Sequence, residues 1–141
     1  MLNKIPKVLS ADLLKLMMVM GHGDELVIGD GNFPAESNGT RVIHLDGHGV
    51  PEILDGILEL MPLDTYVETP VALMAVVPGD PVVPTIWDEY RAILKKHGCE
   101  KEPEFMERFA FYERAKKAFC IVESTELAIY GNIILKKGVV K

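Results

Sequence analysis

The segment that most constrains the fold of this chain is the apolar run from Val71 to Val77. The run contains no polar side chain, has the length of one strand, and is bounded by Pro70 and Pro78. A strand without a polar face is typical of a parallel or mixed sheet that helices cover on both sides. The rest of the chain is therefore expected to supply helices that alternate with strands.

The other segments follow that alternation. Ser10 is a good N-cap for a helix over residues 11–20, and Pro51 suits the first turn of a second helix that ends near Leu60. We expect two further helices over residues 86–97 and 109–118, and strands over residues 25–29, 41–45, 119–122 and 133–135. The pattern predicts a single α/β sandwich domain over residues 1–141, with a mixed, mostly parallel sheet.

Charge and hydropathy exclude several classes of function. The chain has 15 Lys and Arg against 21 Asp and Glu, a net charge of −6, which argues against binding to nucleic acid or to an anionic membrane surface. No apolar run approaches the length of a membrane-spanning helix, and the N-terminus lacks the apolar core of a signal peptide. Hydrophobic residues make up 48% of the chain, so we expect part of the apolar surface to meet another subunit in a homo-oligomer.

The sequence offers no site for a metal or a cofactor. Cys99 and Cys120 are isolated, and we interpret them as reduced thiols of a cytoplasmic protein. His44 and His48 straddle the end of a strand and an Asp-Gly turn, which is not the spacing of a metal site on a helix. No glycine-rich phosphate loop and no nucleophile elbow is present. Acid–base catalysis without a cofactor is the chemistry that is left.

The glycine-rich stretch from residue 21 to 34 is the best candidate for that chemistry. It places His22 and Asp30 at the two ends of a short apolar strand, and glycines beside both allow tight turns. A histidine and a carboxylate can transfer protons near neutral pH. Asp24 could orient the imidazole of His22. The structural alternatives are that Asp24 caps a turn and that Asp30 begins an Asx-turn.

Two later clusters carry further polar groups. Arg108 and Tyr112 lie four residues apart, so one face of a helix could present a guanidinium and a phenol to a polar ligand. Tyr130, Gly131 and Asn132 form an aromatic-glycine-amide triplet between two apolar strands. Without other information, we interpret that triplet as an ordinary hairpin turn.

Six motifs in order give the chain a family likeness. They include Met-Gly-His-Gly-Asp-Glu, Asp-Gly-Asn-Phe-Pro and Tyr-Gly-Asn, and they cover residues 5–10, 20–25, 30–34, 62–66, 108–115 and 130–138. Over nearly its full length the chain resembles the L-fucose mutarotase family, whose relatives include ribose pyranase. The resemblance implies a three-layer α/β/α sandwich and a cofactor-free isomerase that interconverts the α and β anomers of L-fucose. It also implies a ring-shaped decamer with active sites between neighbouring subunits.

The resemblance also assigns roles to single residues. The proton donor of the family falls on His22. The substrate-binding positions fall on Asp30, Asp64, Met74, Arg108, Tyr112, Tyr130 and Asn132. Ribose pyranases tend to carry histidine where this chain has Arg108, which favours the fucose branch.

The identity of the general base stays open, since Asp30, Tyr130 and a bound water are all candidates. Two other functions also stay open at this point. One is interconversion of the pyranose and furanose forms of ribose, and the other is sugar binding without catalysis.

Overall fold

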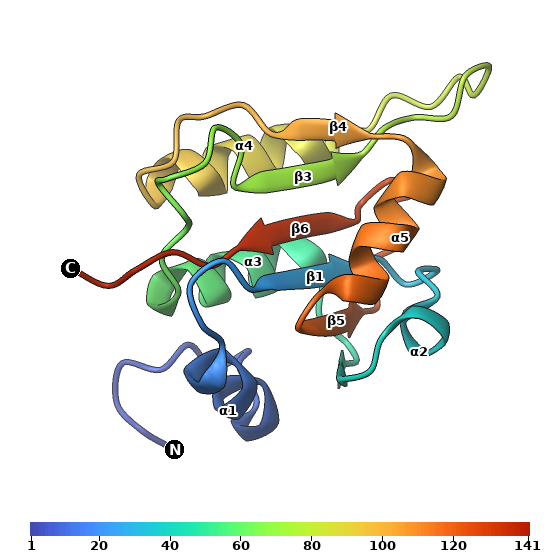
Figure 1. Cartoon of the computed structure of the whole chain (residues 1–141). Helices are drawn as coiled ribbons and strands as arrows, with labels where there is room; N and C mark the ends of the chain where they lie inside the picture. The colour runs from blue at the N-terminus through green and yellow to red at the C-terminus, as the bar shows by residue number, and fades with distance from the viewer.

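Figure 1 shows the computed structural model of the chain, which describes all of residues 1–141. Six strands form one sheet in the order β2-β5-β1-β6-β3-β4. Their bounds are β1 (Glu25–Gly29), β2 (Val42–Leu45), β3 (Val71–Met74), β4 (Glu104–Met106), β5 (Cys120–Ser124) and β6 (Ile133–Lys136). Strand β6 is antiparallel to both of its neighbours and every other pair is parallel, so five strands point the same way. The predicted mixed, mostly parallel sheet is confirmed.

Five helices cover the two faces of this sheet. They are α1 (Ala11–Val19), α2 (Ala35–Asn38), α3 (Val50–Leu60), α4 (Ile86–Lys96) and α5 (Arg108–Lys117). Helix α5 crosses the near face of the sheet in Figure 1, whereas α3 and α4 lie behind it. Ser10 caps α1 as predicted, because its hydroxyl accepts a hydrogen bond of 3.2 Å from the backbone N–H of Leu13. The predicted three-layer sandwich is confirmed.

Strand β3 shows why the fold needs two helical layers. Its four residues are all buried, and they alternate between two separate hydrophobic clusters. Val71 and Leu73 belong to a cluster of 23 buried residues, whereas Ala72 and Met74 belong to a cluster of 10 on the other face. The larger cluster includes residues of α1, α3 and α4, and the smaller one includes residues of α2 and α5.

The structure departs from the sequence predictions in three places. Strand β3 ends at Met74, and the apolar residues that follow it continue into a long loop. Strand β4 and helix α2 were not predicted, because three and four residues are too few to show a period of 2 or 3.6. Residues 125–132 do not form a hairpin, because β1 lies between β5 and β6 in the sheet. This segment instead passes across the end of β1.

None of the five helices combines the length and the apolar character that a membrane-spanning segment requires. Cys99 and Cys120 are both free. Cys120 is buried in the larger cluster, and burial raises the pKa of its thiol to about 12. Its side chain therefore acts as a small apolar group at neutral pH.

Candidate functional site

The direction of the strands divides the predicted site residues between two edges of the sheet. Asp30 follows β1, Met74 ends β3, and Arg108 begins α5 directly after β4, so these three share the carboxyl edge. Asn132 precedes the antiparallel strand β6 and therefore lies at the same edge. His22 precedes β1 and lies at the opposite, amino edge.

An open cavity of about 300 Å³ lies at the carboxyl edge. Six of the eight predicted site residues line it: Asp30, Met74, Arg108, Tyr112, Tyr130 and Asn132. The remaining lining residues are Asn32, Phe33, Val77, Asp80 and Ile129. The cavity is large enough for a small polar ligand and combines a few polar groups with apolar walls.

Asp30 is the most unusual group in this cavity, because it is only 4% exposed and pairs with no basic side chain. One carboxylate oxygen accepts a hydrogen bond of 3.0 Å from the N–H of Asn32, and the other accepts one of 3.3 Å from Gly131. Burial raises the pKa of Asp30, and the backbone hydrogen bonds oppose that rise. Asp30 is thus both an Asx-turn residue and a carboxylate on the cavity wall.

Segment 130–132 is held against Asp30 by close packing. A side chain at Gly131 would place its Cβ 3.0 Å from the carbonyl oxygen of Ala128 and 3.4 Å from Asp30 Cβ. The backbone N–H of Asp30 also donates a hydrogen bond of 2.8 Å to Oδ1 of Asn132. From the far helical layer, the hydroxyl of Tyr90 donates to the carbonyl oxygen of Gly131 at 2.6 Å. The three-residue motif is therefore part of the cavity wall.

Arg108 and Tyr112 share one face of α5, as their spacing predicts. Nε of Arg108 donates a hydrogen bond of 3.1 Å to the hydroxyl of Tyr112, and this bond raises the pKa of Arg108. The ring of Phe33 packs edge-on against Tyr112 with 5.7 Å between centroids. The pair brings a permanent positive charge and a phenol to the rim of the cavity.

The amino edge holds the other two predicted residues, His22 and Asp64. Nε2 of His22 lies 3.1 Å from Oδ1 of Asp64, and the imidazole also packs against the ring of Tyr66. Asp64 is 4% exposed, and the N–H of Tyr66 is the main cause of its lowered pKa, with His22 adding to the effect. The side chain of His22 is 46% exposed, and its other ring nitrogen makes no hydrogen bond within the chain.

The predicted orienting role of Asp24 is wrong. Its carboxylate accepts a hydrogen bond of 2.7 Å from the N–H of Gly21, which is the turn-capping alternative. Asp64 takes the place beside the imidazole although it is 42 residues away in the sequence. No local pattern could have identified this pair.

The two edges cannot act on one small ligand within a single chain. The five residues of β1 separate them, a length of about 16 Å. His22 accordingly does not line the cavity that contains Asp30. Within one subunit, the candidate acid and the candidate base belong to two separate half-sites.

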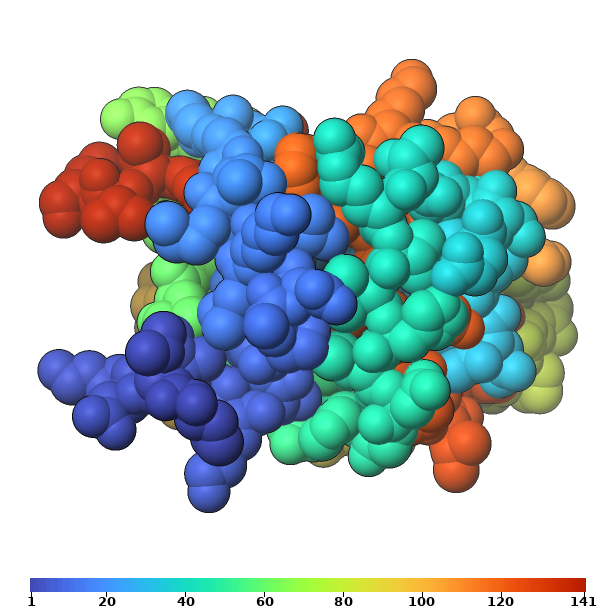
Figure 2. Space-filling model, turned by 90° about the horizontal axis from the view of Figure 1, so that it is seen from below, coloured from blue at the N-terminus to red at the C-terminus, as the bar shows by residue number.

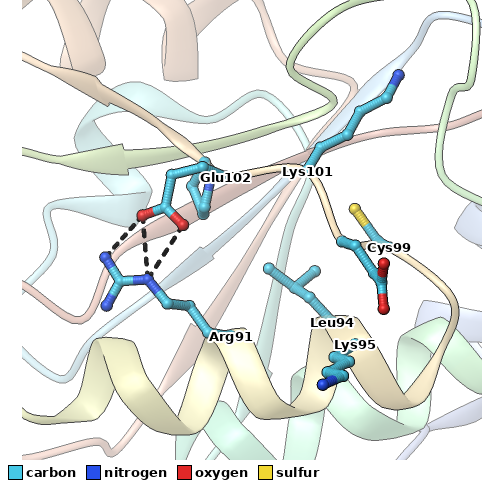
Figure 3. A pocket seen from close by; sticks show the side chains of 8 residues that line it. Arg91, Leu94, Lys95, Cys99, Lys101 and Glu102 are labelled. Atoms are coloured by element: carbon cyan, nitrogen blue, oxygen red, sulfur yellow. Dashed lines mark hydrogen bonds and ion pairs between the residues drawn. The ribbon is translucent and has the colours of Figure 1, made fainter.

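A second hollow, of about 360 Å³, lies beside the C-terminal half of α4 (Figure 3). Its most prominent charged group, Arg91, is already bound to the carboxylate of Glu102 through three hydrogen bonds of 2.8 to 3.3 Å. None of the predicted site residues lines this hollow. The structure also contains no group of three or more His, Cys, Asp or Glu side chains that could hold a metal ion. The carboxyl-edge cavity is therefore the candidate site.

Comparison with known proteins shows the family of the chain. Residues 3–140 match the model of the RbsD / FucU transport protein family. The chain belongs to this family. Among its relatives, the fucose mutarotase of Homo sapiens is 49% identical over 98% of this chain and 94% of its own length. The L-fucose mutarotase of Actinobacillus pleuropneumoniae is 51% identical over 99% of this chain and 97% of its own.

Solved structures of the family show the same fold. The fucose mutarotase of Streptococcus pneumoniae in complex with L-fucose has a TM-score of 0.96 and 50% sequence identity, covering 99% of this chain and all of its own. RbsD of Bacillus subtilis, complexed with D-ribose, has a TM-score of 0.72 at 24% identity over 94% of this chain and 95% of its own. The second likeness concerns the fold alone.

Proposed function

We propose that this protein is an L-fucose mutarotase, an isomerase that interconverts the α and β anomers of the sugar without a cofactor. The observation that carries the proposal is the unpaired, buried carboxylate of Asp30 in a cavity of suitable size. Full-length relatives at about half sequence identity, named as fucose mutarotases, support the same substrate.

The reaction needs one base and one acid. A base removes the proton of the anomeric hydroxyl while an acid protonates the ring oxygen, and the C1–O5 bond breaks. Rotation about the C1–C2 bond followed by the reverse steps gives the other anomer. Asp30 is the base in this proposal, because its raised pKa makes it a better proton acceptor than an ordinary aspartate.

The other cavity residues bind and orient the sugar. The guanidinium of Arg108 donates to sugar oxygens and stabilises negative charge that develops as the ring opens. The amide of Asn132 and the phenols of Tyr112 and Tyr130 bind further hydroxyls. Met74 and Phe33 form the apolar part of the wall, against which the C–H groups and the methyl group of the sugar can pack.

The acid in the proposal is His22 of a neighbouring subunit. Asp64 holds Nε2 of that imidazole, which leaves Nδ1 to deliver a proton to the ring oxygen. The distance between the two edges supports this arrangement, because His22 and Asp30 of the same chain are too far apart to act on one sugar.

The proposed assembly is a ring-shaped homodecamer, and the surface near the amino edge supports the existence of a subunit contact. Met18, Val19, Leu60 and Val140 are exposed there to 83%, 61%, 39% and 79%. In Figure 2 the N-terminal and C-terminal segments project from the same side of the molecule. Apolar surface of this kind is typical of a subunit contact. The free thiols of Cys99 and Cys120 support a cytoplasmic location.

Saturation-transfer NMR on reducing sugars tests the proposed function. With L-fucose we expect transfer between the α and β anomeric resonances to grow in proportion to added protein. D-galactose and D-ribose define the substrate range. Faster exchange between pyranose and furanose forms of ribose alone would favour the ribose pyranase alternative. Resonance shifts with no faster exchange in any sugar would make the protein a sugar binder and contradict the proposal.

A further inference from the structure

One charged residue of the carboxyl-edge cavity has no role in the reaction described above. Asp80 lines the cavity from the long loop between β3 and α4, which projects beyond the sheet at the upper right of Figure 1. In the sequence this loop is a proline-rich segment from Pro78 to Pro84, with no feature that marks one of its residues as functional.

The loop is folded so that the carboxylate of Asp80 meets a single phenol. Oδ1 of Asp80 accepts a hydrogen bond of 3.1 Å from the N–H of Val82, and the N–H of Asp80 donates to the carbonyl oxygen of Val77 at 3.0 Å. Oδ2 accepts a hydrogen bond of 2.6 Å from the hydroxyl of Tyr130. The N–H of Val77 donates to the same hydroxyl oxygen at 3.3 Å.

The backbone of Tyr130 is held as firmly as its hydroxyl. Its φ angle of 60° lies in the left-handed region, which aromatic residues seldom adopt. Nε1 of Trp87 donates a hydrogen bond of 2.8 Å to the carbonyl oxygen of Tyr130. Trp87 is the second residue of α4, the helix that follows the loop of Asp80, so one stretch of chain, residues 77–87, fixes both ends of Tyr130.

A count of hydrogen-bonding positions then defines what Tyr130 can offer to a ligand. A phenol has one proton to donate and two lone pairs to accept. The proton is given to Asp80, and one lone pair takes the N–H of Val77. We propose that Asp80 is a positioning residue that makes Tyr130 a pure hydrogen-bond acceptor in the cavity, so that Tyr130 recognises a sugar hydroxyl and transfers no proton.

This inference rests on the proposed function for its substrate, and it narrows the choice of base. The hydrogen bond to the Asp80 carboxylate is the main cause of the raised pKa of Tyr130, while the positive charge of Arg108 opposes the rise. A phenol in this state is not a phenolate at neutral pH. Binding of the sugar, rather than the rate of the chemical step, is therefore expected to depend on Asp80.

The variant Asp80→Asn tests this role. An asparagine has one oxygen in place of two, so it can no longer accept hydrogen bonds from both the N–H of Val82 and the hydroxyl of Tyr130. The hydroxyl of Tyr130 is then free to donate its proton into the cavity. We expect KM for L-fucose to rise about tenfold and kcat to change less than about twofold. Asp88→Asn, on the exposed face of α4, is the matched control and leaves both constants unchanged. A fall in kcat at unchanged KM would overturn the proposal.

A double-mutant cycle checks that Asp80 acts through Tyr130. In a Tyr130→Phe background we expect Asp80→Asn to add no further rise in KM. If the two effects simply multiply, the proposed route through the hydroxyl is wrong.

A spectroscopic titration tests the same contact without any substrate. The phenolate absorbance that Tyr130→Phe removes identifies the ionisation of Tyr130. In Asp80→Asn that ionisation is expected at lower pH than in the unmodified protein, and in Asp88→Asn it is not displaced. An undisplaced ionisation in Asp80→Asn overturns the inference. Because the titration needs no sugar, it separates failure of this inference from failure of the proposed mutarotase activity.

Discussion

Each edge of the sheet carries one buried aspartate, and the two behave in opposite ways. Asp30 and Asp64 are both 4% exposed. At the carboxyl edge Asp30 forms no ion pair with a basic side chain, and burial raises its pKa. At the amino edge the N–H of Tyr66 and the imidazole of His22 lower the pKa of Asp64. The two aspartates therefore suit different roles, Asp30 that of a proton acceptor and Asp64 that of a fixed anion that orients a histidine.

The comparison also shows what a single subunit lacks. The carboxyl edge has a cavity with a buried carboxylate and polar binding groups but no imidazole, whereas the imidazole of His22 is oriented at the amino edge and does not line that cavity. If the proposed function is right, the two edges must meet across a subunit contact. Experiments that remove or recombine the two halves are the sharpest tests.

Removal of the imidazole is expected to have the largest effect. His22→Ala should lower the rate of anomer exchange by about 10²–10⁴-fold, the range for loss of a general acid. The oligomer should survive, because in the proposed assembly the exposed apolar residues near the amino edge, rather than His22, supply most of the subunit contact. Saturation transfer with L-fucose measures the rate, and sedimentation measures the assembly. An unchanged exchange rate would refute the role of His22.

Recombination of two inactive variants gives the next largest effect. Asp30→Asn should also lose most of its activity, since it removes the base. When His22→Ala and Asp30→Asn subunits are unfolded together and reassembled, about one site in four should receive both intact residues, if each site uses two subunits. We expect recovery toward that fraction of full activity. If the mixture is no more active than the separate variants, each site is formed by a single chain and the shared-site proposal is wrong.

Much of the fold could be predicted because it depends on local patterns. The apolar run after Pro70, the cap at Ser10 and the alternation of strand and helix were sufficient to predict a two-faced sheet. The parts of the fold that were not predicted are short or depend on residues far apart in the sequence. Strand β4 is three residues long, and the path of residues 125–132 across β1 depends on the strand order of the whole sheet.

The residues of the candidate site also fall into those that local sequence patterns predicted and those that only the tertiary structure identifies. Residue types and motif likeness indicated His22, Asp30 and Arg108, because each stands in a distinctive local stretch. The partner of His22 was assigned to Asp24, its neighbour in sequence, whereas tertiary structure supplies Asp64 from 42 positions away. Asp80 was missed for the same reason, since its contact with Tyr130 spans 50 residues.

The two candidate partners of the imidazole allow a matched test. Asp64→Asn should slow exchange by about tenfold, because it replaces a charge-assisted hydrogen bond to His22 with a weaker one. Asp24→Asn should change the rate less than about twofold, because its carboxylate contacts only the N–H of Gly21. Saturation-transfer rates for both variants provide the measurement. The reverse order of the two effects would return the orienting role to Asp24.

The smallest expected effect is a displacement of the acid limb of activity. A raised pKa means that Asp30 takes up its proton while the pH is still above the ordinary aspartate range, and the base is then lost. Asp64, with its lowered pKa, stays ionised over that interval. We therefore expect kcat/KM for L-fucose to fall with an apparent pKa above about 3.9, and Asp64→Asn to leave that limb in place.

Stability should respond to the same two groups with opposite signs. The stability that protonated Asp30 contributes is present below the ordinary aspartate pKa and is lost as the pH rises through its raised value. The contribution of Asp64 is present above the ordinary value and is lost as the pH falls through its lowered one. Urea unfolding at several acidic pH values, for the unmodified protein and Asp64→Asn, measures the contribution of Asp64 to the free energy of unfolding. For the pH dependence of activity, the contradicting result is an acid limb of kcat/KM that moves in Asp64→Asn. That result would show that a group at the amino edge, and not Asp30, is the titrating base.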